Sequence, residues 1–200
     1  MRKQVTTLAL AAALAVSLVT FAIAWRSPGN NQGYEPVQPI AFSHKLHAGE
    51  MQIACFYCHL GAERSRHAAI PASSICMNCH KNVTKPSSQQ ANVESPELRK
   101  LYDALALDQG LAPIPGQAPR PIAWRRVHQL PDFVYFDHRA HTTAGVSCQQ
   151  CHGPVATMDR IRQVETLGMG WCVDCHRAST ANGIAGKPVH ASTDCVTCHF

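Results

Sequence analysis

The first hydrophobic feature of the chain is an uncharged run close to its N-terminus. Arg2 and Lys3 precede an apolar stretch that continues to Trp25. This stretch is long enough to cross a bilayer as one helix, whereas the core of a cleaved signal peptide is usually about 7–15 residues long. Residues 1–25 are therefore predicted to form a transmembrane anchor, and a signal peptide cleaved after Ala24 is the alternative.

The basic residues at the start of the run predict its orientation. Basic flanks stay on the cytoplasmic side, so the chain after residue 25 is expected on the periplasmic side of the inner membrane. Residues 26–40 are rich in Pro, Gly and Asn and have no periodic pattern. We interpret them as a tether between the anchor and the body.

Beyond the tether, the apolar positions show one clear helical period. Leu98, Leu101 and Leu105 share one face of a helix predicted from Pro96 to Leu107, with Ser95 as its N-cap. No sustained alternation of apolar and polar residues indicates a strand. The pattern predicts short α-helices and coil with little or no β-sheet.

Composition changes this picture more than periodicity does. The 200 residues are 46% hydrophobic but only 6% aromatic, and much of the apolar content lies in the N-terminal run, so the ordinary core is thin. Ten cysteines and twelve histidines are the anomaly. All ten cysteines lie in five Cys-x-x-Cys-His motifs: Cys55-Cys58-His59, Cys76-Cys79-His80, Cys148-Cys151-His152, Cys172-Cys175-His176 and Cys195-Cys198-His199.

The motifs divide the body into segments. Two lie within residues 41–85 and three within 135–200, and a helical and Pro-rich connector at 86–134 separates them. We expect a dihaem and a trihaem module, because a redox dithiol or a zinc site would not require histidine directly after every pair. A histidine directly after all five Cys-x-x-Cys pairs would occur by chance about once in a million. The ten cysteines are predicted to attach five haem c groups, with His59, His80, His152, His176 and His199 as proximal iron ligands.

Seven further histidines are enough to saturate all five irons. A haem with two protein ligands transfers electrons, whereas a catalytic haem keeps one position open. The sequence therefore favours electron transfer, with no catalytic residue in this chain by itself. These histidines are His44, His47, His67, His128, His138, His141 and His190.

Two stretches repeat the pattern Phe-x-His-x-x-His before a motif, namely "AFSHKLHAGEMQIACFYCH" and "YFDHRAHTTAGVSCQQCH". This pattern resembles the class III multihaem cytochromes c, in which the first histidine binds the haem just downstream and the second binds a neighbour. The resemblance implies that His44 and His138 serve the haems of Cys55-Cys58 and Cys148-Cys151. It implies that His47 and His141 reach neighbouring haems, most simply those of Cys76-Cys79 and Cys172-Cys175.

The fifth haem has no assigned distal ligand in the sequence. Histidine ligation and a role as an ordinary surface residue are both open for the spare histidines, and methionine ligation would raise the potential. The candidates are His190, His67, His128, Met158 and Met169.

The net charge of +5 could suggest an anionic partner. Each ferric haem c contributes about −1, because two propionates outweigh the charge of the iron–porphyrin core, so five haems bring the total to about zero. Basic residues are then counter-charges for propionates, and nucleic acid is not expected as a partner.

Nearly the whole chain resembles the pentahaem cytochrome c subunit of alternative complex III. The N-terminal run, the two-plus-three motif arrangement, and the segments "AWRRVHQLPDFVYFDHRAHTTAGVSCQQCHGPV" and "LGMGWCVDCHR" carry this resemblance. It implies integral-membrane quinol-oxidising subunits and an iron–sulfur subunit as partners. It also implies a monohaem cytochrome c or a terminal oxidase as acceptor. A self-sufficient membrane-anchored quinol dehydrogenase, a multihaem reductase and a free soluble shuttle are the alternatives.

Overall fold

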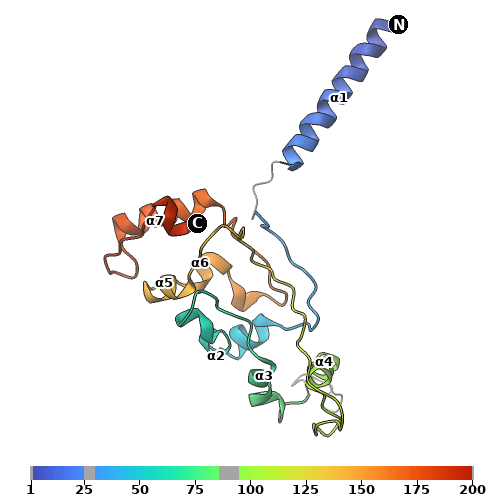
Figure 1. The fold of residues 1–200 in the computed structure, drawn as a ribbon, viewed down its shortest axis with the longest axis vertical. Helices are drawn as coiled ribbons and strands as arrows, with labels where there is room; N and C mark the ends of the chain where they lie inside the picture. Colours follow the sequence, from blue (N-terminus) through green and yellow to red (C-terminus); the bar gives the residue numbers. More distant parts are fainter. Residues whose placement is uncertain (1, 25–29, 86–94, 200) are drawn as a thin grey trace.

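A computed structural model describes residues 2–24, 30–85 and 95–199 (Figure 1). In the N-terminal helix, side chains are described for residues 10–21. Parts of four predicted segments lie outside the described residues. They are Met1 and Trp25 of the anchor, residues 26–29 of the tether, residues 86–94 of the connector and Phe200 of the trihaem module.

Short helices joined by coil make up the body, and the described residues form isolated β-bridges but no strand. This confirms the predicted fold class of short helices and coil without a sheet. The α-helices are α1 (Arg2–Ala24), α2 (Cys55–Cys58), α3 (Ser73–His80), α4 (Pro96–Ala104), α5 (His138–Thr143), α6 (Cys148–His152), α7 (Met169–Asn182) and α8 (Cys195–Cys198). A π-helix, η1 (Lys45–Glu50), and two 3-10 helices, η2 (Leu60–Glu63) and η3 (Val155–Thr157), complete the set.

Helix α1 covers the run that was predicted as an anchor, and it stands apart from the body in Figure 1. Its side chains at 10–21 are exposed. Within the described part of the chain, no helix combines the length and apolar character that a membrane span needs.

Helix α4 ends three residues before the predicted boundary at Leu107. Arg99 explains the early end, because its guanidinium donates to the carbonyls of Leu107 at 2.7 Å and Asp108 at 3.3 Å. The backbone turns out of the helix at Ala106, where φ is 54°. Ser95 occupies the N-cap position as predicted, but its hydroxyl makes no capping hydrogen bond.

The apolar core is small, and most of its described side chains belong to α4 or to the turn that follows it. Among the described residues, the buried apolar side chains are Ala62, Leu101, Tyr102, Ala104, Ala106, Val127 and Met158. The Tyr102 hydroxyl donates to the His80 carbonyl at 2.7 Å, which joins α4 to the end of α3. The helices that carry the motifs contribute almost nothing to this core.

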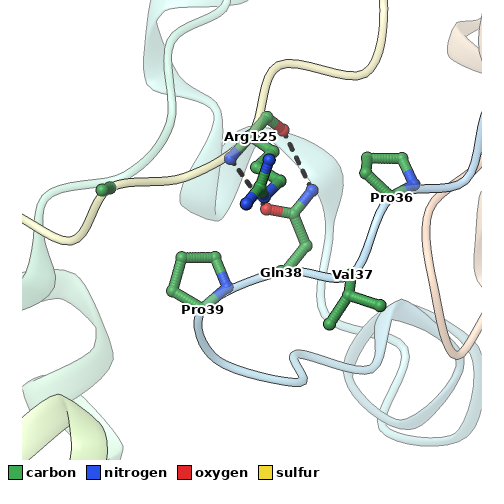
Figure 2. Close-up of a pocket in the computed structure, with 6 residues that line it drawn as sticks. Pro36, Val37, Gln38, Pro39 and Arg125 are labelled. Carbon is green, nitrogen blue, oxygen red and sulfur yellow. Dashed lines mark hydrogen bonds between the residues drawn. The ribbon is translucent and has the colours of Figure 1, made fainter.

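Part of the predicted tether lies against the body. Gly33 N–H donates to the Gln163 carbonyl at 2.8 Å, and Gln163 N–H donates to the Tyr34 carbonyl at 3.1 Å. Further on, the Gln38 amide donates to the Arg125 carbonyl and accepts from the Arg125 N–H, both at 2.9 Å. Figure 2 shows this pairing at the edge of an open hollow that Pro36 and Pro39 also line. Residues 30–40 are therefore fixed along the body and are not a free spacer.

The dihaem and trihaem modules predicted from the sequence pack together through η2 and α5. Thr142 donates its hydroxyl to the Ala62 carbonyl at 3.0 Å. The backbone N–H groups of His138 and Arg139 donate to the carbonyls of Arg66 and Ser65, both at 3.2 Å. Contacts between residues far apart in sequence thus bring the two modules together (Figure 1).

We expect Tyr102→Phe to lower the free energy of unfolding by about 1–2 kcal/mol, because the His80 carbonyl loses a hydrogen-bond donor in a buried setting. Urea unfolding of the holoprotein, followed by circular dichroism, measures this change. Tyr34→Phe is the matched control, since Tyr34 is 42% exposed and bonds through its backbone. Equal stability of the two variants would contradict the role given to the Tyr102 hydroxyl.

Candidate haem-binding sites

Each Cys-x-x-Cys-His motif folds as one helical turn. The first cysteine starts α2, α6 and α8, whereas α3 and α7 contain the motif within a longer helix. The His59 N–H donates to the Cys55 carbonyl at 2.9 Å, and His199 bonds to Cys195 in the same way. Residues three and four apart share one helix face. Each motif therefore presents two thiols and one imidazole on a single side.

Three of the motif histidines donate a ring Nδ1–H to a backbone carbonyl. The pairs are His59 with Ala69 at 2.7 Å, His80 with Val83 at 2.8 Å and His176 with Ser192 at 2.5 Å. A carbonyl can only accept, so the proton is on Nδ1 and the Nε2 lone pair is free. Histidines that bind metals typically have this arrangement.

The two Phe-x-His-x-x-His stretches have nearly identical internal geometry. In each copy the phenylalanine ring meets the first histidine edge-on and stacks on the second. The ring centroids lie 4.9 Å apart in both edge-on pairs, Phe42–His44 and Phe136–His138, and 4.4 and 4.5 Å apart in the stacked pairs Phe42–His47 and Phe136–His141. This agreement is what an internal duplication predicts.

The second histidine of each copy is oriented by its own helical turn. His47 Nδ1 bonds to the Ser43 carbonyl at 2.9 Å, and His141 Nδ1 bonds to the Asp137 carbonyl at 2.8 Å. Both partners are four residues upstream of the histidine. The local helix geometry alone thus leaves Nε2 free at these two positions.

The first histidines of the two copies differ. His138 Nδ1 bonds to the Arg66 carbonyl at 2.8 Å, a contact between the two modules. The buried His44 Nδ1 has no hydrogen-bond partner among the described residues. The copies therefore share ring geometry but not the partner of this nitrogen.

Three pairs of imidazoles face each other at nearly equal distances. The ring centroids are 6.1 Å apart in His47–His80, 6.0 Å in His141–His176 and 6.3 Å in His138–His152. An iron bonded to both Nε2 atoms at about 2 Å, each about 1 Å from its ring centre, separates the centroids by about 6 Å. These distances therefore fit a haem iron that each pair of imidazoles would hold.

His44 lies in the electrostatic neighbourhood of His59, the motif histidine of its own stretch. Burial, followed by the nearby His59 and His47, lowers the pKa of His44 to about 4. A buried neutral imidazole is the form that can bind a metal. The resemblance to class III cytochromes assigned His44 to this same motif.

The structure brings no histidine candidate for the fifth distal ligand face to face with His199, within the part of the chain that it describes. The His199 ring is instead 5.7 Å from the Phe133 ring. His67 and His190 are exposed, and His128 contacts His152. Of the methionines, Met158 is 8% exposed, its carbonyl bonded to Lys45 N–H, whereas Met169 is 67% exposed.

The motifs lie in a row whose order differs from the sequence. Burial and then the nearby Cys79 raise the pKa of Cys58, and burial and then Cys58 raise the pKa of Cys76. The thiols of these two motifs therefore lie close together. After burial, a neighbouring cysteine likewise raises the pKa of three further thiols. Cys55 acts on Cys148, Cys175 on Cys151 and Cys198 on Cys172, so these pairs also lie close together. The row runs from Cys76-Cys79 through Cys55-Cys58, Cys148-Cys151 and Cys172-Cys175 to Cys195-Cys198, which agrees with the succession of α3, α2, α6 and α7 in Figure 1.

Hydrogen bonds support the two ends of this row. Asn78, within the Cys76-Cys79 motif, donates to the hydroxyl of Tyr57 in the Cys55-Cys58 motif at 3.1 Å. At the other end, the Tyr135 N–H donates to the Cys198 carbonyl at 2.7 Å and joins the last motif to the second Phe-x-His-x-x-His stretch.

The thiols do not have the character of a redox dithiol. Burial is the main cause that raises the pKa of Cys151 to about 11, and burial also raises the pKa of Cys58, Cys76, Cys148 and Cys172. Reactive dithiols lower the pKa of the attacking thiol. Zinc sites use three or four protein ligands, whereas the imidazoles here face each other in twos.

Sequence reasoning missed two residues. Arg66 lies with its guanidinium 4.1 Å from the Tyr135 ring centre, and its buried Nε has no partner among the described residues. His128 was considered as an iron ligand or a surface residue, but not as a partner of His152, whose Nδ1 lies 3.3 Å from its Nε2. Both contacts join residues far apart in the chain, so no local pattern could indicate them.

Comparison with known proteins agrees with this geometry. Residues 134–200 match the family described as cytochrome c7 and related cytochrome c. Over 182 residues the chain is 24% identical to a protein of Nitratidesulfovibrio vulgaris (strain Hildenborough) named "Menaquinone reductase, multiheme cytochrome c subunit". The match covers 81% of this chain and 76% of that protein. The C-terminal third of the chain is thus similar to this cytochrome c family, and most of the chain is similar to a multihaem cytochrome c subunit, which agrees with the five Cys-x-x-Cys-His motifs.

Proposed function

We propose that the chain is a five-haem electron-transfer subunit of a membrane-bound quinone oxidoreductase, with its haem region on the periplasmic side. The observation that carries the proposal is the unbroken row of five motifs, with imidazoles facing each other at about 6 Å. Haem c, when bound, supplies reversible one-electron chemistry at its iron. The protein's part is to hold these groups close together and in a fixed order.

Each group of residues has one task in this proposal. The ten motif cysteines form thioether bonds, and five histidines bind the irons from the motif side: His59, His80, His152, His176 and His199. Four more histidines bind from the opposite side, namely His44, His47, His138 and His141. Their Nδ1 bonds hold most of these rings with Nε2 facing the metal.

Two protein ligands on an iron leave no position for a substrate. The facing pairs His47–His80, His138–His152 and His141–His176 therefore support electron transfer rather than catalysis at these sites. A self-sufficient reductase needs an open iron. Beyond these three pairs, His44 is an electrostatic neighbour of His59, and no spare histidine among the described residues is paired with His199.

The assignment to a particular complex rests on resemblance. The quoted segments and the two-plus-three motif arrangement support a subunit of alternative complex III. Such a subunit is anchored by residues 1–25 and receives electrons from quinol-oxidising membrane subunits through an iron–sulfur subunit. A monohaem cytochrome c or a terminal oxidase then accepts the electrons. The ends of the row, at Cys76-Cys79 and Cys195-Cys198, are the positions at which partners would exchange electrons with the chain.

A second candidate is supported by the relative's name. A menaquinone reductase delivers electrons to the quinone pool, so the same row would work in the opposite direction. The two candidates share every residue assignment above and differ in the direction of flow.

The direction can be measured on the complex that co-purifies with a tagged chain in mild detergent. If the alternative complex III assignment holds, a menaquinol analogue reduces the haems, which optical spectra record. Oxidation of pre-reduced haems by a menaquinone analogue, without reduction by the quinol, would favour the second candidate. Rapid reduction by quinol of the isolated chain would contradict a subunit role and favour a self-sufficient dehydrogenase.

We expect the mass of the purified holoprotein to correspond to five attached haems. Replacing Cys195 and Cys198 by Ala should lower the count by one and leave the other motifs loaded, because this motif lies at one end of the row. Mass spectrometry of the intact protein and haem staining after denaturation give the count. Any other number in the parent protein would overturn the proposed function.

We expect His44→Ala and His47→Ala each to free one iron position without loss of covalent haem. A high-spin signal and carbon monoxide binding at one haem should appear in each variant, because the lost imidazole is the distal ligand. Leu46→Ala is the control, since Leu46 lies between them on η1 and is exposed. An unchanged low-spin spectrum in either histidine variant would contradict the assignment for that residue.

A further inference from the structure

The ring of His152 differs from the other oriented imidazoles in the partner of its Nδ1. Six histidines bond through Nδ1 to a backbone carbonyl, namely His47, His59, His80, His138, His141 and His176. His152 Nδ1 instead lies 3.3 Å from Nε2 of His128. The two rings are nearly perpendicular, at 79°, with centroids 4.3 Å apart.

His152 is therefore flanked on two sides. The His138 ring is 6.3 Å away and tilted by only 10°, which fits an iron between the two rings. His128 occupies the Nδ1 side. Because His152 donates through Nδ1 when its Nε2 faces a metal, the His128 Nε2 must accept the hydrogen bond. That lone pair is then not available to an iron.

The segment around His128 holds this ring in place. Val127 is buried, and the Arg126 guanidinium donates to the His128 carbonyl at 3.1 Å. Arg125 is fixed by two hydrogen bonds with Gln38, which lies far away in the sequence. His128 itself is half-buried, so the surrounding segment limits the movement of its ring.

We propose that His128 is a positioning residue that accepts the Nδ1 hydrogen bond of His152 and lowers the reduction potential of the haem at Cys148-Cys151. This inference rests on the proposed function, in which His152 is an iron ligand. An imidazole nitrogen, with a pKa of about 6.5, is a much stronger base than a peptide carbonyl. His152 therefore gains more negative character, which stabilises the ferric iron.

The duplicated stretch provides an internal comparison. In the first copy, His59 donates to a carbonyl and His44 Nδ1 has no partner among the described residues. In the second copy, His152 donates to an imidazole and His138 to a carbonyl. Both differences make the ligands of the second copy more electron-rich. The haem at Cys148-Cys151 should therefore have a lower potential than the haem at Cys55-Cys58.

The test compares His128→Leu, which removes the acceptor, with His128→Gln, whose side-chain oxygen can still accept. Gln129→Leu is the matched control, because Gln129 is exposed and adjacent, and among the described residues its side chain bonds only to the Arg126 carbonyl, at 3.4 Å. Potentiometric titration of each holoprotein resolves the redox transitions, and electron paramagnetic resonance reports the spin state.

In His128→Leu we expect one transition to move to a more positive potential while every haem stays low-spin. His128→Gln should lie between this variant and the parent, and Gln129→Leu should match the parent. Unchanged transitions in His128→Leu would overturn the inference. A new high-spin site in both variants would overturn it too, because His128 would then be an iron ligand.

If the His128→Leu protein does not accumulate, the same two measurements on His128→Gln test the inference. Low-spin haems with one transition moved part of the way to positive potential support the inference, and either parent potentials or a high-spin site overturn it. The proposed function fails by a different result, namely a haem count other than five in the parent protein.

Discussion

The hydrogen bond from a histidine Nδ1 to a backbone carbonyl is the interaction on which the candidate sites depend. It fixes the proton on one ring nitrogen, frees the other and limits rotation of the ring. Each carbonyl comes from a turn or loop whose course is set by other backbone bonds. A chain with few buried apolar side chains can still hold many imidazoles accurately, because hydrogen bonds do the orienting.

This dependence also explains why the core is so small. Most of the buried apolar side chains belong to α4 or to the turn after it, where Tyr102 connects the core to the end of α3, and the motif helices themselves contribute none. Helices of four or five residues such as α2, α6 and α8 are far too short to be stable alone. Porphyrins attached to their cysteines would bury the apolar surface that these helices lack. The folded state and the loaded state of such a chain are then closely linked.

Local patterns in the sequence predicted features that are set within one helical turn, and few features that depend on residues farther apart. The helical turns of the motifs and the equal ring geometry of the two Phe-x-His-x-x-His copies follow from spacing alone. The predicted end of α4 was wrong because the actual end depends on the Arg99 guanidinium. Residues 30–40 were interpreted as part of a tether from their composition, and their hydrogen-bond partners were not predicted because these partners lie far along the chain. The contact between His128 and His152, and the succession of the motifs in space, likewise join distant residues. No pattern within a window of sequence contains such information.

The order of the motifs shows how the duplication is built. The two copies meet through their first motifs, since Cys148 lies near Cys55, and Thr142 of α5 bonds to the Ala62 carbonyl in η2. The second histidine of each copy faces away from this junction, His47 toward His80 and His141 toward His176. The copies are thus arranged back to back, and not head to tail as their sequence order suggests. The extra motif at Cys195-Cys198 lengthens only one arm, while α4 packs at the end of the other. An approximately symmetric pair has become a row with two chemically different ends, which is what a protein needs if it contacts one redox partner at each end.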